Sequence, residues 1–489
     1  MKQMMRVTSL VLVCTLFLVN DGVAQNVQGV PVQMTLDDAI RIAMSNNPGY
    51  LQANNNLRLN RTNTLLTWGN TLLPRVSLSV LRTSVGGNVV QTAFDNFGNP
   101  IQNPDSEWRY SSSSNQSLNF SWGFTGTSLF RNHREMQLTN EGREIQFETQ
   151  TNQIERTVKQ QFLSVQQSQF QLQLQDMILV DRQRDLITTE RRRALGQGTT
   201  RIDVRLAELA IKQQEQTIAT QRRTLQLTLL TLRATLGDSG LGPIEIVPTP
   251  IAVFEPSGLD AEALVLVAQT SSPQARSAEN TLENQALSLT NVKQNAWIPS
   301  FTSSLRLGRG INARDLTGAL FEVADYPDGK DLSFTLTLSF PIFSNYFQTK
   351  QQLTQAQVNY ENQEATYRQT QLDFERTVRS GYQNLVSQYE ALVLAVESGE
   401  IAADALRLAR DAYAIGASSF DQLQQSVTGD ANARRDVINA QYSFITNFIN
   451  LENAIGLPVP VGDAAYARAL AELGDISTGG IGLGAAGGN

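Results

Sequence analysis

Few side chains in this sequence could carry out chemistry. His133 is the only histidine among 489 residues, and Cys14 is the only cysteine. A single histidine removes most catalytic triads and histidine metal sites, and a single cysteine excludes a disulfide within the chain. The carboxylates are scattered, and no pair of them stands out for acid–base work. We therefore expect no enzymatic activity, no catalytic residue, no bound metal and no cofactor.

One short run imitates a nucleotide-binding motif. The letters GLGAAG at 482–487 fit the pattern GxGxxG, in which a loop and a helix start would hold a pyrophosphate. This run follows no predicted strand and opens no predicted helix. We interpret it as part of a flexible, Gly-rich tail within a C-terminal extension at 458–489.

The N-terminus has the pattern of a secretory signal peptide at 1–24. Lys2 and Arg6 precede an apolar run at 7–19, and the small residues GVA at 22–24 precede Gln25. Cys14 lies inside the apolar run, and Val13 before it is not the small residue that a lipidation site needs. We expect cleavage near Ala24 or Gln25 and export of a chain without cysteine.

The charge balance of the exported chain is mildly acidic. Loss of Lys2, Arg6 and Asp21 from the 39 basic and 46 acidic residues leaves a net charge of −8. Nucleic-acid binding requires a basic face, so no nucleic-acid partner is expected. No later stretch approaches the ~18 consecutive apolar residues of a transmembrane helix. Any crossing of a membrane would therefore use strands.

Four long segments without proline predict unusually long helices, at about 128–195, 201–236, 343–415 and 420–455. Apolar residues recur in them every seven positions, as in the series Val158, Val165, Leu172, Leu179 and Leu186. This spacing is typical of left-handed supercoiled helix packing. At ~1.5 Å per residue, the longest segment would extend about 100 Å.

Four other segments alternate apolar with hydroxyl-bearing residues, the period of two of a strand. They lie at about 74–84, 115–126, 299–309 and 331–341, and the polar stretch from 84 to 115 predicts a long loop. The residues expected on the outward, membrane-facing side of these strands are Val76, Leu78, Val80, Leu118, Phe120, Trp122, Phe124, Phe301, Leu305, Leu307, Leu332, Phe334, Leu336, Leu338 and Phe340.

The chain contains an internal duplication. The tetrapeptide Glu-Arg-Thr-Val occurs at 155–158 and again at 375–378, 220 residues later. The pairs Leu195-Gly196 and Ile415-Gly416 are separated by the same 220 residues. Matching pairs at a nearly constant offset indicate two tandem repeats of helix, β-hairpin, long helix and helix. The predicted units are repeat 1 at 34–237, a linker at 238–258 and repeat 2 at 259–457.

Two interpretations of this pattern remain open from the residues alone. Heptad helices of this length are typical of an exported coiled-coil structural or adhesive protein. Four amphipathic strands cannot close a barrel within one chain, because closed barrels begin at about eight strands. An open sheet edge in lipid is not tolerated, so several chains would have to combine their strands.

The order of these motifs resembles the TolC-like outer membrane efflux proteins, over roughly 34–457. The resemblance rests on LDDAI at 36–40 before Asn47-Pro48, on Pro74 and Pro299 before the strands, and on the duplicated words and glycine turns. It implies a homotrimer in which four strands per chain form a 12-stranded barrel in outer membrane lipid. A long α-helical tunnel would continue the barrel through the periplasm. The implied partners are a periplasmic adaptor (membrane fusion) protein and an inner-membrane RND or ABC transporter.

The same resemblance assigns roles to the two glycine turns. They would form the periplasmic tips, where the adaptor docks, and the residues concerned are Leu195, Gly196, Gln197, Gly198, Thr199, Thr200, Ile415, Gly416, Ala417, Ser418 and Ser419. The family often has an acidic ring just beyond each tip. The matching positions here give the candidate gate residues Asp203, Asp421, Gln422 and Gln425, so the ring would be partly amide. Asp203 and Asp421 have a second interpretation as residues that cap a helix or complement its dipole, worth ~0.3–1 kcal/mol.

Taken together, the sequence predicts a mainly α protein with a transmembrane β part. Its expected function is that of an outer membrane channel in a tripartite efflux or type I secretion system. In that role the protein would be a passive conduit between an inner-membrane pump and the outside.

Overall fold

The computed structural model describes residues 32–91, 97, 99–100, 106–125, 128–196, 198–237, 244–250, 253–313, 330–340 and 346–457. The expected signal peptide at 1–24, the extension at 458–489 and Gln197 lie outside these residues. So do the side chains of Val80 and Phe124.

The elements of the chain follow one order twice. The first half contains β1 (Val32–Met34), α1 (Leu36–Asn46), α2 (Pro48–Leu72), β2 (Arg75–Gln91), β3 (Ser106–Thr125), α3 (Ser128–Ala194) and α4 (Arg201–Leu236). The second half contains β4 (Ile244–Ile246), η1 (Pro256–Gly258), α5 (Ala261–Ser271), α6 (Pro273–Trp297), β5 (Ser300–Ala313), β6 (Lys330–Ser339), α8 (Tyr346–Ala414) and α9 (Phe420–Ile455). The expectation of a mainly helical chain with a small sheet is confirmed.

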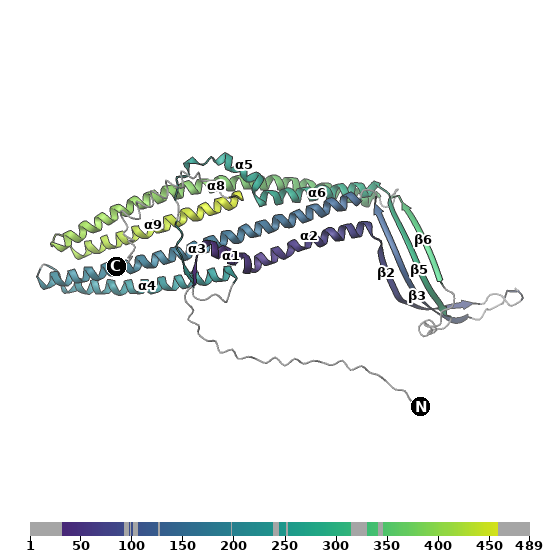
Figure 1. The fold of residues 1–489 in the computed structure, drawn as a ribbon, viewed down its shortest axis with the longest axis horizontal. Helices are drawn as coiled ribbons and strands as arrows, with labels where there is room; N and C mark the ends of the chain where they lie inside the picture. Colours follow the sequence, from purple (N-terminus) through teal and green to yellow (C-terminus); the bar gives the residue numbers. More distant parts are fainter. Residues whose placement is uncertain are drawn as a thin grey trace, which may run out of the picture.

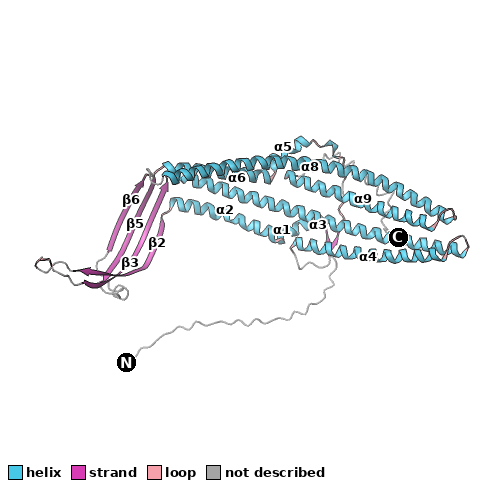
Figure 2. Ribbon diagram, turned by 180° about the vertical axis from the view of Figure 1, so that it is seen from behind, coloured by secondary structure: helices cyan, strands magenta, loops and turns pink. Residues whose placement is uncertain are grey.

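Two very long helices carry the molecule from end to end. α3 has 67 residues and α8 has 69, which corresponds to about 100 Å each. The seven-residue series packs α3 against α4 and α8 against α9, so two helical hairpins lie side by side (Figure 1). Figure 2 shows the same hairpins from behind, with the sheet at the opposite end from the turns. Among the described residues, no helix is both long and apolar enough to span a bilayer.

The four long strands form one antiparallel sheet in the order β2-β3-β5-β6. The register places Leu118 opposite Leu78 and Leu307, and Leu305 opposite Phe334. Directly paired residues point to the same face, so the apolar residues of all four strands share one face. Most hydroxyl-bearing residues lie on the other face, and Ser303, paired with Trp122 and Leu336, lies on the apolar one. β2 and β6 are the two edges of this sheet and have no further strand partner among the described residues.

The first hairpin extends further than the alternation of the sequence predicts. β2 continues to Gln91 and β3 begins at Ser106, although the stretch from 84 to 115 predicts a loop. A register shift between Ser79 and Arg82 accounts for part of the difference, because a bulge reverses which residues face which side. Beyond it β3 contains four consecutive serines at 111–114 and β2 contains Gly86 and Gly87, and backbone pairing continues there with little apolar alternation.

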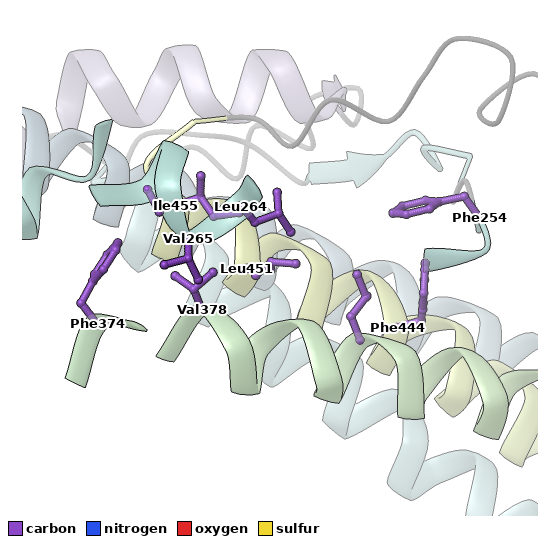
Figure 3. Packing of buried hydrophobic residues seen from close by; sticks show 10 residues of the cluster. Phe254, Leu264, Val265, Phe374, Val378, Phe444, Leu451 and Ile455 are labelled. Carbon is purple, nitrogen blue, oxygen red and sulfur yellow. The ribbon is translucent and has the colours of Figure 1, made fainter. Parts of the chain in front are cut away.

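Short helices and strands pack against the middle of the long helices, and we call this region the collar. In the second half, Leu264, Val265 and Ala268 of α5 pack with Val378 and Leu451 in a buried cluster that includes Phe254 and Phe444 (Figure 3). In the first half, a corresponding cluster joins α1 to α3 and α4, and β1 pairs in parallel with β4 beside it. These clusters fix where the short helices join the long ones.

A second duplicated pair, Leu236-Gly237 in the first half and Ile455-Gly456 in the second, has a packing role in this collar. Gly237 ends α4 with a φ of 73°, and a Cβ atom there would lie 2.6 Å from the carbonyl oxygen of Asn46. Gly456 ends α9 with a φ of 81°, and a Cβ atom there would lie 2.9 Å from Cα of Ser272. Both glycines provide a left-handed helix end; Gly237 lies close to the junction of α1 and α2, and Gly456 lies close to the junction of α5 and α6.

Candidate functional site at the helix tips

The turns between the long helices form a pair of matching tips. Gly196, Gly198 and Gly416 have φ values of 70°, 72° and 85°, so each turn reverses the chain through left-handed backbone. Leu195 and Ile415 project from the two turns and are 72% and 81% exposed. Single exposed apolar side chains are common on protein surfaces, so this exposure alone assigns no role to the tips.

Capping boxes start both return helices. The Thr200 hydroxyl accepts from the N–H of Asp203 at 3.2 Å, and the carboxylate of Asp203 accepts from the N–H of Thr200 at 2.7 Å. Ser419 and Gln422 repeat this exchange at 3.3 and 3.1 Å. Both pairs satisfy backbone groups that a helix start leaves without partners.

The four candidate gate residues therefore differ in what they contact. Asp203 and Gln422 cap their helices, in agreement with the capping interpretation of Asp203. Asp421 lies in the first turn of α9 and accepts from Nε2 of Gln425 at 2.9 Å. Asp421 and Gln425 are exposed, and their gating role stays a prediction.

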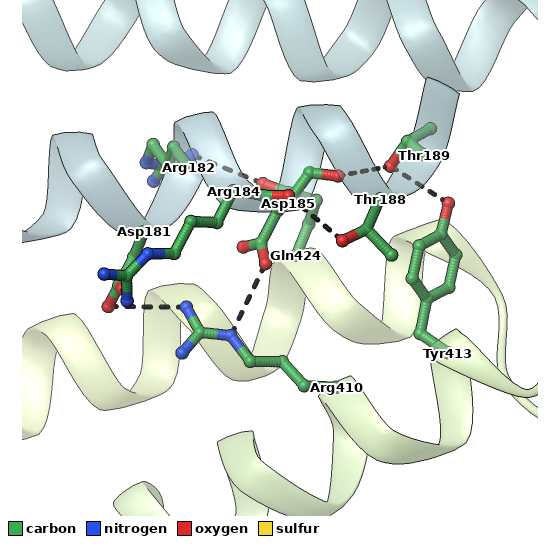
Figure 4. A network of polar contacts seen from close by, with 9 residues as sticks. All are labelled: Asp181, Arg182, Arg184, Asp185, Thr188, Thr189, Arg410, Tyr413 and Gln424. Atoms are coloured by element: carbon green, nitrogen blue, oxygen red, sulfur yellow. Dashed lines mark hydrogen bonds and ion pairs between the residues drawn. The ribbon is translucent and has the colours of Figure 1, made fainter. Parts of the chain in front are cut away.

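A polar network joins the two hairpins within about four helical turns of the tips (Figure 4). Arg410 of α8 approaches Asp181 of α3 at 3.3 Å and Asp185 at 3.4 Å. The hydroxyl of Tyr413 donates to Oγ1 of Thr189 at 3.1 Å. The Arg192 guanidinium lies over the Tyr413 ring, 4.1 Å from its centroid. We call Asp181, Asp185, Thr189, Arg192, Arg410 and Tyr413 the tip lock.

Burial shifts the pKa values of two charged residues in and beside the tip lock, so their charged forms depend on neighbouring partners. Asp185 is only 5% exposed, and its Oδ2 atom accepts no hydrogen bond from the described residues. Burial raises the pKa of Asp185 above its ordinary value, while Arg410 opposes the rise. Burial also lowers the pKa of Arg182, whose Nη1 atom donates to Gln424 of α9 at 3.3 Å. A charged Asp185 in this site is costly unless Arg410 stays beside it.

Further from the tips, the contact between the hairpins consists largely of amides. Asn439 of α9 accepts from Gln167 at 3.0 Å and from Gln171 at 2.9 Å, and Asn450 accepts from Gln160 at 2.8 Å. A small apolar cluster around Leu163 and Tyr442 lies between them. The two hairpins are therefore joined by separate polar contacts more than by one continuous apolar seam.

Sequence reasoning missed most of the tip lock. Tyr413 belongs to an apolar heptad series, and nothing in its local sequence indicates a partner in α3. The signal that could have found the site is the spacing of Asp181, Asp185, Thr189 and Arg192, which places four polar residues on one helix face. Within the described residues, no three His, Cys, Asp or Glu side chains lie close enough to hold a metal ion.

The fold of this chain is similar to the folds of several solved outer membrane proteins. CusC covers 88% of this chain and 96% of its own, with a TM-score of 0.68 at 18% identity. VceC from Vibrio cholerae covers 86% and 96%, with a TM-score of 0.65 at 17% identity. MtrE from Neisseria gonorrhoeae, an outer membrane channel solved in an open state, covers 86% and 89%, with a TM-score of 0.62 at 18% identity. No curated protein matches the sequence.

The sequence itself matches one family model over part of its length. Residues 264–457, nearly all of repeat 2, match the family model of the outer membrane efflux proteins. The resemblance to the TolC-like outer membrane efflux proteins is thereby confirmed. The match agrees with the expectation of a channel, rather than an enzyme, in the outer membrane with an extension into the periplasm.

Proposed function

We propose that this protein is a trimeric, passive conduit of a tripartite export system. The observation that carries the proposal is a four-stranded sheet with one apolar face, joined end to end to helices of about 100 Å. Three such sheets would supply the twelve strands of a closed barrel, in which β2 of one chain pairs with β6 of the next. An adaptor and an inner-membrane transporter of the RND or ABC class would complete the pump.

The exposed apolar face of the sheet supports contact with lipid. Leu78, Leu332 and Phe334 are 66–69% exposed in the single chain, and Val76, Leu336 and Leu338 are each 58% exposed. The helices of the same chain leave this face uncovered. A face of this kind needs either lipid or a partner, and the hydroxyl-rich opposite face suits a water-filled lumen.

A charge on the lipid face should therefore prevent membrane assembly. We predict that Phe334→Asp destabilises the inserted protein by roughly 2 kcal/mol and sharply lowers the heat-modifiable trimer in outer membrane fractions. Thr335→Asp, on the opposite face of the same strand, is the matched control and should leave the trimer level close to wild type. Equal loss in both variants, or recovery of the wild type as a soluble rod, would refute the lipid assignment.

The tips are the proposed docking surface for the adaptor. Leu195 and Ile415 are exposed at the ends of both turns, where a helical hairpin of a periplasmic partner could contact them. Leu195→Ser combined with Ile415→Ser should reduce cross-linking to the adaptor at least tenfold, while the amount of trimer stays unchanged. Leu227→Ser removes a leucine of α4 that is 54% exposed and lies far from the tips. The Leu227→Ser variant should cross-link to the adaptor as strongly as wild type. If the double variant still cross-links to the adaptor, the adaptor docks elsewhere.

The tip lock is the proposed gate that keeps the conduit closed. Its contacts hold the α8–α9 hairpin to the α3–α4 hairpin, and the short glycine turns allow a hairpin to swing with little backbone strain. Separation of the hairpins would widen the tunnel end, with Asp421 and Gln425 facing the widened aperture.

A further inference from the structure

A large polar cavity lies between the helices near the collar, far from the tip lock. Its volume is about 1040 Å³, and it extends along α3 between α2, α6, α8 and the end of α9. Its described lining residues include two arginines, ten amide side chains and six hydroxyls, and none of them is Asp or Glu. In a chain with a net charge of −7, a cavity of this size without a carboxylate favours an anion.

Among the described residues, the hydrogen-bond partners of the two cavity arginines are amide side chains. Arg143 donates through Nη1 to Asn60 and Asn140, both at 3.2 Å, and Arg156 donates to Gln153. Nε of Arg156 is buried and has no hydrogen-bond partner among the described residues. The neighbouring carboxylates already have cations of their own, because Glu148 pairs with Arg276 at 2.6 Å and Glu155 pairs with Lys159 at 2.7 Å. In the described part of the chain, neither cavity guanidinium takes part in an ion pair.

The start of a helix adds to the positive potential at the Arg156 end. α6 begins at Pro273, which lines the cavity together with Gln274. Its N-cap residue Ser272 makes no side-chain capping bond, so the first N–H groups of α6 have no side-chain acceptor there. Arg156 and the dipole of α6 thus both favour a negative group at this end.

The shape of the cavity indicates an elongated ligand. Arg143 and Arg156 are thirteen residues apart on one helix, which corresponds to ~20 Å along the axis. Between them the lining consists mainly of amides and hydroxyls, with Phe147 and Phe374 as its aromatic surface. Carboxylates suit the guanidinium ends, and hydroxyl groups suit the amides between them.

We propose that this cavity binds an elongated, hydroxyl-rich organic anion of the acidic oligosaccharide class. Ile154 and Val158 of α3 pack against the collar, whereas Arg156 lies about 200° around the helix from each of them. The cavity lies beside the collar, because Phe374 of its lining also belongs to the buried cluster of the second half. That the cavity opens into the conduit rests on the proposed function. In that setting the cavity is a resting point for anionic cargo.

Calorimetric titration of the full-length protein in detergent tests the site. Trigalacturonate should bind saturably, and maltotriose, an uncharged sugar of the same length, should bind at least tenfold more weakly. Arg156→Gln and Arg143→Gln should each weaken trigalacturonate binding about tenfold, and Arg156→Lys should stay within about threefold of wild type because it keeps the charge. Arg134→Gln removes a guanidinium outside the cavity that pairs with Glu283 at 2.5 Å, and it should not change the affinity.

Absence of saturable trigalacturonate binding would overturn the proposal, as would equal affinity in wild type and Arg156→Gln. Equal affinity for maltotriose would overturn the anion assignment. Conductance in planar bilayers is measured separately on the same preparation. A conducting protein without trigalacturonate binding would refute only this site, and a binding protein without conductance would refute only the conduit.

Discussion

Replacement of Arg410 by alanine should open the channel. Asp185 is 5% exposed, and the change leaves its carboxylate buried without the neighbouring cation. This loss destabilises the closed state, in which the two hairpins are joined, but not the open state, in which they are separated. Loss of one partner of a buried pair costs about 3–5 kcal/mol, and roughly 2 kcal/mol is appropriate here because the Arg410 side chain is 33% exposed. That corresponds to about a thirtyfold shift toward the separated state. Single-channel recording in planar bilayers should show a larger open probability and mean conductance.

Arg407→Ala is the matched control, because Arg407 lies three residues before Arg410 in α8. Arg407 pairs with Asp404 at 3.4 Å, and both side chains are largely exposed, at 66% and 74%. Exposed pairs contribute about 0–1 kcal/mol, so this variant should conduct like wild type. If Arg410→Ala and Arg407→Ala behave alike, the tip lock does not hold the gate.

Acidification should reverse part of the Arg410→Ala effect. Burial raises the pKa of Asp185, so the joined state binds a proton more tightly than a separated, hydrated state does. Lowering the pH toward that raised pKa therefore favours the joined state, and raising the pH above it weakens the joined state. Without Arg410 the carboxyl loses the main influence that lowers its pKa. The conductance gain of the variant should accordingly be largest near neutral pH and smaller in acid.

Replacement of Gly237 by alanine should cause the largest loss of stability. Its φ of 73° disfavours any side chain, and the new Cβ atom would lie 2.6 Å from the Asn46 oxygen and 2.9 Å from Cα of Asn47. Both contacts are with backbone, which cannot move aside as a flexible side chain can. We expect a loss of about 3 kcal/mol, from ~1 kcal/mol for the left-handed backbone and the rest for the overpacked contact.

Gly198→Ala separates these two contributions. Gly198 has nearly the same φ, 72°, but a Cβ atom there would meet nothing within 4 Å. Melting curves recorded by circular dichroism at one scan rate should show a drop for Gly237→Ala well beyond that for Gly198→Ala. Gly456→Ala, the equivalent change in repeat 2, should resemble Gly237→Ala. Equal melting of the Gly237 and Gly198 variants would show that close packing at the collar contributes nothing.

Much of the fold could be predicted from local pattern. Pro74 and Pro299 separate helices from strands, and the seven-residue series indicates long helices paired in hairpins. The alternation in β6, from Leu332 to Leu338, identifies the strand and its apolar face. The serine-rich half of the β2–β3 hairpin could not be predicted in this way, because strand pairing there depends on backbone bonds rather than on an apolar side.

The candidate site was less accessible to sequence reasoning. Thr200 and Asp203 have capping-box spacing, so the capping interpretation of Asp203 followed from local chemistry. The contact of Arg410 with Asp185 joins residues more than two hundred positions apart. It depends on how the two hairpins are set side by side, which no local pattern specifies.

The arrangement of strands between neighbouring molecules tests the central claim most directly. A cryo-electron microscopy structure of the exported protein in lipid nanodiscs should show three chains, with the β2 edge of each hydrogen-bonded to the β6 edge of the next and the apolar face against lipid. A single chain whose sheet keeps both edges free, or packs its apolar face on its own helices, would contradict the channel account.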